Sequence, residues 1–183
     1  MQKKVLSEID LYYGEIKMPK GFEINRNKIK NDAIKSFITE DRISNKPKNH
    51  SYKNYKIPYS QPLQWMQDYI RDHWGVEYYY TLVTKNQHVK VLQPGEQSIL
   101  MHSLEPVDLK NSPDYTLIYG VEVEDESCEC IIEYDDNRRK NRTWHIPVKN
   151  NYFIMFPATQ RYMITENTSK KLNTILVINY EYI

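Results

Sequence analysis

Residues 151–182 read NYFIMFPATQRYMITENTSKKLNTILVINYEY, and this stretch decides the fold that the sequence predicts. It begins with a short apolar run, Phe153 to Phe156, that ends at Pro157. Residues 172–182 form a longer run that is rich in β-branched and aromatic side chains, which favour strands. The polar residues 166–171 lie between the two runs and have the composition of a turn. The stretch therefore predicts two strands joined as a hairpin.

The same stretch carries a spaced set of residues: Phe156, Pro157, Ile164, Asn167, Ser169 and Asn179. Spaced in this way, they resemble the C-terminal end of the double-stranded β-helix in the Fe(II)/2-oxoglutarate oxygenases. The resemblance is strongest to the small prolyl-hydroxylase-like group of marine phages and bacteria. That group reads F-P-S-x-x-x-H-x-V-x-P-N-x-S and then R-x-S-I-x-F-N. The resemblance implies a cupin-like, jelly-roll fold.

The sequence departs from this pattern where the resemblance places the chemistry. Tyr162 stands in the position of the second iron-binding His, and Asn173 stands where an Arg would pair with the 2-oxoglutarate carboxylate. The wider cupin pattern, G-x5-P-x-G-x2-H, also puts Tyr162 at a metal position. A neutral phenol with a pKa of about 10 is a poor ligand for Fe(II). The resemblance thus implies the fold together with a degenerate metal motif.

The first His and the acid of the iron site form an H-x-D motif in the resembled family. His102 lies in the corresponding region, but Leu104 occupies the acid position. Glu105 follows one residue later, and an extended chain would point it to the opposite face from Leu104. A bulge or loop could still bring Glu105 to the site, so His102 and Glu105 are the candidate metal ligands. A site made of His102 with His145 or His88 stays open, although no spacing rule links these residues.

Length and charge limit the functional classes. A chain of 183 residues suits one domain, with residues 1–75 as a helical N-terminal segment and 76–183 as the β-helix core. The formal net charge of +1 gives no reason to expect binding to nucleic acid or to an anionic membrane. No apolar run is long enough to span a membrane, and the first ten residues lack the apolar region of a secretory signal. We expect a cytoplasmic protein, or one in the host cytoplasm if a phage encodes it.

Helical spacing is confined to the first part of the chain. After an extended segment, residues 10–24, Asn25 is a suitable N-cap for a helix with apolar residues at helical spacing as far as Ile38. Residues 39–60 are polar and predict an irregular loop, either a lid over a pocket or a plain connection. Residues 62–74 predict a second helix with proline in its first turn. Two N-terminal helices should therefore pack outside the β-helix.

From residue 76 onward the pattern changes to alternation, which is typical of strands. Short strands separated by turns favour a sandwich or jelly roll. The expected strands before the hairpin are residues 76–83, 87–93, 98–104, 115–123, 128–134 and 143–148. The residues that we expect to share one core are Tyr115, Leu117, Tyr119, Val121, Phe153, Met155, Leu176 and Ile178.

The two cysteines, Cys128 and Cys130, would point to the same face of a strand. A disulfide between residues two apart on one strand would be strained. A soft-metal pair stays open but lacks further thiol ligands. We expect two reduced, partly buried thiols, which fit a reducing compartment.

Three functional hypotheses follow. The first is a non-catalytic relative of the oxygenases, which would be a binding or structural protein and would have no catalytic residues. The candidates for its pocket are His102, Tyr162, Asn173 and Tyr119. It needs no cofactor and would bind an unknown small molecule or protein. The second is an active oxygenase with irregular ligands, which would need Fe(II) and 2-oxoglutarate. The third is a jelly-roll assembly component of a phage or capsid-like structure, since a homo-oligomer is compatible with the sequence.

Overall fold

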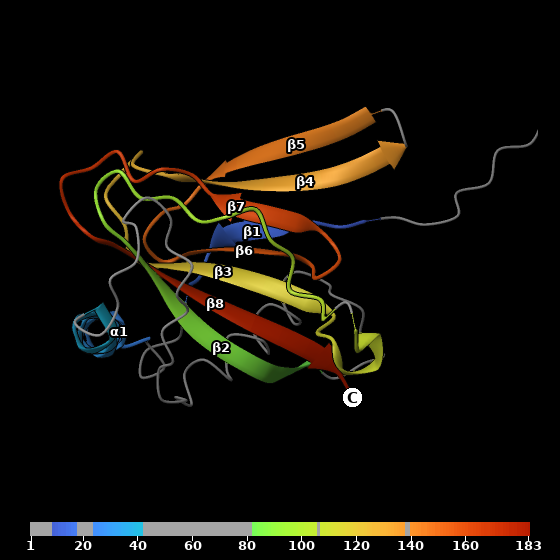
Figure 1. The fold of residues 1–183 in the computed structure, drawn as a ribbon, viewed down its shortest axis with the longest axis horizontal. Helices are drawn as coiled ribbons and strands as arrows, with labels where there is room; N and C mark the ends of the chain where they lie inside the picture. The colour runs from blue at the N-terminus through green and yellow to red at the C-terminus, as the bar shows by residue number, and fades with distance from the viewer. Residues whose placement is uncertain (1–8, 18–23, 42–81, 106, 138–139) are drawn as a thin grey trace, which may run out of the picture.

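The computed structural model describes residues 9–17, 24–41, 82–105, 107–137 and 140–183 (Figure 1). Within these residues the chain consists mainly of antiparallel strands, with one α-helix and one short 3-10 turn. The bounds are β1 Tyr12–Glu15, α1 Arg26–Asp41, β2 Leu82–Leu92, η1 Leu109–Asn111, β3 Tyr115–Glu122, β4 Glu129–Asn137, β5 Lys140–Pro147, β6 Tyr152–Pro157, β7 Arg161–Ile164 and β8 Asn173–Tyr182. The prediction of a mainly β fold is confirmed from β2 onward.

The strands form two sheets. The larger sheet has the order β1-β6-β3-β8-β2 and the smaller has the order β5-β4-β7. The chain alternates between them, since β3, β6 and β8 lie in the larger sheet whereas β4, β5 and β7 lie in the smaller. An isolated antiparallel bridge between Met101 and Tyr162 adds the segment before β3 to the smaller sheet. This alternation is consistent with the expected jelly roll.

The hairpin predicted for residues 151–182 is wrong. β6 and β8 do not pair with each other, because each pairs with a different side of β3. The segment between them contains β7, which pairs with β4 in the other sheet. Tyr162 and Ile164 of β7 are buried while Arg161 is exposed, so this segment is a half-buried strand and not a turn. A connection of this length has room for a strand, whereas hairpin loops usually have two to five residues.

The two strands predicted for residues 76–83 and 87–93 form one strand, as far as the structure describes them. β2 pairs with β8 along almost its whole length, from Leu82 opposite Tyr182 to Leu92 opposite Asn173. The polar residues that suggested a turn form a bulge between Thr84 and Asn86 instead. A bulge absorbs one extra residue without ending the ladder, so the long partner strand keeps both halves together.

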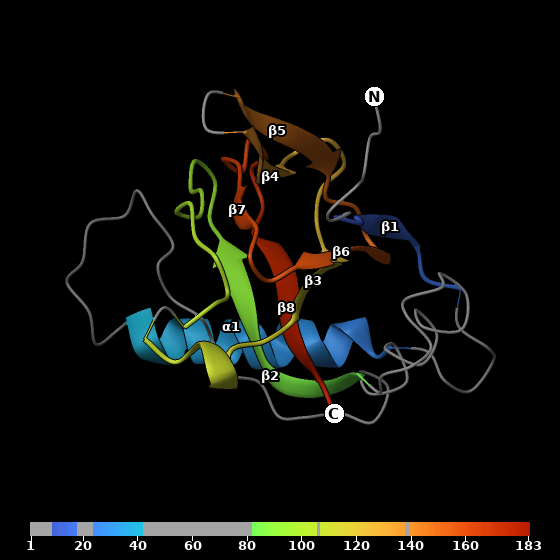
Figure 2. The same ribbon diagram turned by 90° about the vertical axis from the view of Figure 1, so that its right-hand side faces the viewer.

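The first predicted helix is confirmed as α1. Asn25 caps it, because its Oδ1 accepts a hydrogen bond of 2.9 Å from the backbone N–H of Lys28. Figure 2 shows α1 lying across one face of the larger sheet, where its residues Ile29 and Ala33 are buried. Helix α1 therefore covers the outer face of this sheet.

Other N-terminal predictions lie mostly outside the described residues. The second helix, residues 62–74, falls there entirely, so the structure confirms one of the two expected helices. Residues 39–41 of the predicted loop belong to α1, and residues 42–60 are not described. Among the described residues, no helix combines the length and the apolar character needed to cross a membrane.

Each face of the larger sheet supports its own core. The eight residues that we expected to share a core do so on the outer face, next to α1, with Tyr115 at its edge. A second core fills the space between the two sheets. Its members from both sheets include Leu92, Ile118, Cys128, Cys130, Ile132, Ile146, Ile154, Phe156, Tyr162, Ile164 and Ile175.

One glycine allows two backbone segments to come unusually close. A Cβ atom at Gly120 would lie 1.9 Å from the carbonyl oxygen of Lys149. The carbonyl of Gly120 accepts a hydrogen bond of 2.9 Å from the backbone N–H of Asn151. Only glycine leaves room for this contact between β3 and the turn before β6.

Candidate functional site

The candidate site lies on the inner face of the larger sheet, which the smaller sheet covers. Cross-strand partners in the ladder share a face, so their register shows which side chains point inward. Lys90 is opposite Ile175, which belongs to the inner core. Thr116 of β3 is opposite Asn179 of β8, four residues further along the same face. These strands therefore bring polar side chains into the interior between the sheets.

A chain of hydrogen bonds connects the two sheets near Tyr162. Thr116 Oγ1 lies 2.6 Å from Ser103 Oγ and 3.1 Å from Asn179 Oδ1. The Tyr162 hydroxyl is hydrogen-bonded to Ser103, and Asn179 Nδ2 donates to Asn86 Oδ1 at 2.8 Å. Each hydroxyl has one proton, so a consistent assignment runs from Tyr162 through Ser103 and Thr116 to the Asn179 carbonyl. These buried side chains thus supply one another's hydrogen-bond partners.

Tyr162 is a buried, neutral phenol. Only 1% of its surface is exposed, and its ring packs edge-on against Phe156 with the centroids 5.3 Å apart. Burial raises its pKa well above the ordinary value, the nearby Cys130 thiol raises it further, and the hydrogen bond to Ser103 only partly offsets these effects. A raised pKa disfavours the phenolate, which is the form in which a phenol binds a metal ion.

His102 lies beside Tyr162 in the backbone but does not point toward it. Met101 forms the bridge, with reciprocal N–H to O distances of 2.9 and 2.7 Å to Tyr162. The next residue in an extended chain points to the other side. His102 is accordingly exposed, and its Nδ1 lies 3.1 Å from the Leu104 carbonyl oxygen, to which it can donate.

Glu105 lies in the exposed loop that follows. Its backbone N–H donates to Ser112 Oγ at 2.8 Å, and its side chain is exposed. Across the residues that the structure describes, no three His, Cys, Asp or Glu side chains are grouped so that they could hold a metal ion. The pair His102 and Glu105 is therefore not joined there by a third such ligand.

Asn173 connects β8 to the turn between β3 and β4. Its Oδ1 accepts from the Glu124 backbone N–H at 3.2 Å, and its Nδ2 donates to Ser127 Oγ at 2.8 Å. The same Nδ2 lies 3.5 Å from Cys128 Sγ. The side chain is fully buried, so its amide is used within the protein. Where the resemblance places an Arg, this chain therefore has an Asn whose side chain stabilises a turn by hydrogen bonds.

Tyr119 lies on the opposite face of the larger sheet from Tyr162. It belongs to the core beneath α1, and its hydroxyl donates to Asn151 Oδ1 at 2.9 Å. Burial raises its pKa to about 12. The four pocket candidates therefore do not converge on one cavity, because Tyr119 faces α1 and His102 faces solvent.

Sequence reasoning missed Lys90, the buried cation of the interior. Lys90 is fully buried, its Nζ lies 3.7 Å from Met101 Sδ, and burial lowers its pKa to about 8. His88, two residues earlier on the same face, has a buried Nε2 with no hydrogen-bond partner. Its pKa is lowered to about 3, mainly by burial and additionally by the charge of Lys90. The sequence predicted a strand at residues 87–93 but could not show that the smaller sheet covers one of its faces.

The side chains of this interior do not fit an iron site of the two-His, one-carboxylate type. In the described residues, the metal position is a buried phenol, the acid position is Leu104, and His102, the His of the expected motif, is exposed. The position of the carboxylate-binding Arg is a buried amide that is already hydrogen-bonded.

No protein-family model matches the sequence, and no characterised protein matches it at the sequence level. Solved structures are similar. One is a prolyl hydroxylase from Trichoplax adhaerens, solved in complex with a hypoxia inducible factor peptide fragment. This match has a TM-score of 0.62 at 8% sequence identity, and it covers 93% of this chain and 83% of that one. The carbocyclase SnoK from nogalamycin biosynthesis gives a TM-score of 0.61 at 8% identity, covering 93% of this chain and 78% of that one.

A viral collagen prolyl hydroxylase from Paramecium Bursaria Chlorella virus-1 gives a TM-score of 0.54 at 14% identity. That match covers 92% of this chain and 95% of the viral protein. Identities this low concern the fold and leave activity open. The chain has the fold of the 2-oxoglutarate/Fe(II) oxygenases.

Proposed function

We propose that this protein is a non-catalytic binding protein that keeps the oxygenase fold without its iron centre. The observation that carries the proposal is the state of Tyr162 and Asn173. Both occupy positions that the resemblance assigns to cofactor binding, and both are buried and hydrogen-bonded to other parts of the protein. Freeing either group would break these bonds and leave polar atoms unpaired, which is costly inside a protein.

The test is calorimetric titration of 2-oxoglutarate into protein loaded with Fe(II) or with Mn(II), together with an assay for succinate release. We expect no metal-dependent binding in the micromolar range and no succinate above a protein-free control. A His102→Ala variant serves as the matched control, because His102 is exposed and its loss should leave the fold intact. Micromolar, metal-dependent binding that disappears in His102→Ala would restore the enzyme hypothesis.

A further inference from the structure

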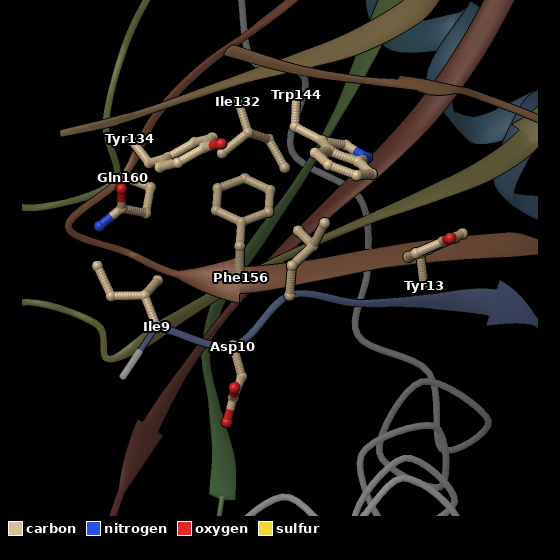
Figure 3. A pocket seen from close by; sticks show the side chains of 9 residues that line it. Ile9, Asp10, Tyr13, Ile132, Tyr134, Trp144, Phe156 and Gln160 are labelled. Carbon is tan, nitrogen blue, oxygen red and sulfur yellow. The ribbon is translucent and has the colours of Figure 1, made fainter. Parts of the chain in front are cut away.

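A groove lies between the edge strands of the two sheets (Figure 3). It has a volume of about 340 Å³, which falls within the range of small-molecule sites. Strand β1 is at one edge of the larger sheet and β5 is at one edge of the smaller sheet. The apolar residues that line the groove are Ile9, Leu11, Ile132, Tyr134, Trp144 and Phe156.

The groove combines a fixed floor with exposed walls. Phe156 is 1% exposed, and in Figure 3 its ring stands between Ile132 and Trp144 on one side and the residues near β1 on the other. Trp144 is 52% exposed and Ile9 is 54% exposed, although both are large and apolar. An exposed tryptophan above a buried ring offers a slot for a flat or narrow apolar group.

One end of the groove is polar. A smaller hollow of about 200 Å³ shares Ile9 and Gln160 with the groove and is also lined by Thr159, Glu133 and Arg161. Gln160 lies at this end in Figure 3, next to Tyr134. The apolar slot and the polar hollow therefore lie next to each other.

The polar end presents a cation more than an anion. Arg161 Nη2 lies 2.6 Å from Glu133 Oε2, and the Arg161 side chain is 51% exposed whereas that of Glu133 is 19% exposed. A guanidinium has five N–H donors, so this single contact leaves others for a ligand. The remaining acid, Asp10, points away from Phe156 in Figure 3, and its Oδ2 accepts a hydrogen bond of 3.3 Å from the Tyr12 hydroxyl.

We propose that this groove binds a small amphipathic acid. Its apolar body, a planar ring or a short acyl chain, lies against Trp144 and Phe156, and its carboxylate contacts Arg161. The size of the groove and the charge at its polar end favour this occupant over a protein surface. Phe156 at the floor of the groove packs against Tyr162, but neither Tyr162 nor Asn173 lines the groove, so the proposal does not depend on the absence of catalysis.

Anilinonaphthalene sulfonate, a flat apolar anion that fluoresces when bound in apolar surroundings, is the direct probe. Octanoate, octanol and octylammonium then compete with it, since they share a chain and differ in the head group. We expect one probe site, and octanoate should compete about tenfold better than octylammonium, a difference of about 1.4 kcal/mol. Near-ultraviolet circular dichroism shows that each variant keeps native packing.

Two variants separate the parts of the site. Trp144→Ala should weaken probe binding about tenfold or more, as truncation of a central aromatic contact usually does. Its matched control is Leu109→Ala, which removes an apolar side chain that is 67% exposed outside the groove and should change nothing. A double variant, Arg161→Gln with Glu133→Gln, keeps a neutral pair and should abolish the preference for octanoate.

Three results would overturn the proposal. The first is probe binding that Trp144→Ala does not weaken. The second is equal competition by the three head groups. The third is sedimentation velocity that shows a ligand-free dimer lost in Trp144→Ala, because a second copy of the chain would then be the occupant of the groove.

Discussion

A lysine and a histidine two residues apart on one strand face define the chemistry of the interior. Lys90 lies between Val89 and Val91, which point to the outer face and are fully buried, so this end of β2 is covered on both faces. A strand buried on both faces usually reads as continuous apolar sequence. The polar residues on β2 are therefore exceptions, and such exceptions often mark a functional position.

Replacing Lys90 with Met removes a buried charge and keeps most of the volume. Burial lowers the pKa of Lys90 from 10.5 to about 8, so the unfolded chain holds its proton more tightly. The wild type should gain stability as pH rises between these values, relative to the variant. Near pH 7 the variant should be more stable, by on the order of 2–4 kcal/mol, because each unit of pKa corresponds to about 1.4 kcal/mol. Urea melts from pH 7 to 10.5 measure the difference, and a gap that is independent of pH would contradict the assignment.

His88 should limit stability in acid. Burial, followed by the charge of Lys90, lowers its pKa from 6.5 to about 3, so the neutral ring is favoured in the folded state. Its contribution is fully present above pH 6.5 and is lost as pH falls towards 3, because the unfolded chain takes up the proton first. His88→Gln should therefore lose less stability than the wild type over this window. Parallel acid-range melts of the two proteins are the measurement, and identical pH dependence would show that His88 is not buried in neutral form.

At the scale of single residues, the sequence motif predicted part of the candidate site. The pattern placed Tyr162 at a metal position, and the structure shows a buried, hydrogen-bonded phenol there. It could not show that Asn173 fastens a turn, because the partners Glu124 and Ser127 are about fifty residues away in the chain. Lys90 carried no motif at all, and its burial follows only from the arrangement of both sheets.

At the scale of elements, β3 is the centre of the larger sheet. Its neighbours β6 and β8 were correctly predicted as strands but wrongly paired with each other. Apolar runs identify strands reliably when both faces are covered, whereas partner choice depends on long-range packing that local sequence does not encode. The segment that forms β7 was interpreted as part of a connection because polar residues surround it.

The central position of β8 predicts a large effect of Leu176→Ala. Leu176 is fully buried in the core beneath α1 and lies opposite both Val89 and Tyr119. Its truncation should lower the free energy of unfolding by about 2–5 kcal/mol. Val107→Ala, at a side chain that is 99% exposed, is the control and should stay within about 0.5 kcal/mol. Denaturant melts measure both, and a loss below about 0.5 kcal/mol for Leu176→Ala would mean that this side chain faces water.

The end of β3 predicts a different kind of defect. Gly120→Ala would place a Cβ atom 1.9 Å from the Lys149 carbonyl oxygen, so two backbone segments must move apart. We expect a loss of about 3 kcal/mol or more, at the upper end of overpacking effects. Gly95→Ala is the control, since its nearest neighbour is 3.9 Å away and only its φ of +79° is unfavourable, at a cost of about 1–2 kcal/mol. A thermal melt in which Gly95→Ala is the more damaging change would contradict this account.

For the whole molecule, the larger sheet acts as a shared wall. Helix α1 covers one face and the smaller sheet covers the other, so loosening either layer exposes one of the two cores. An ion pair of 2.6 Å between Lys30 and Glu122 joins α1 to β3 on the outer side. Alternation and composition predicted this architecture in outline, because they report which segments are half-buried. The oligomeric state and the jelly-roll assembly hypothesis stay predictions.

The two buried thiols provide a way to measure how often the space between the sheets opens to solvent. Cys128 and Cys130 are free, buried and directed into the space between the sheets, and burial raises the pKa of Cys128 to about 11 and that of Cys130 further. Neither is a thiolate at neutral pH, and both are buried, so a disulfide reagent reacts only when an opening of the structure exposes them. The rate at which a chromogenic disulfide reagent reacts with Cys128 and Cys130 would therefore measure the rate of this opening, without any engineered probe in the protein.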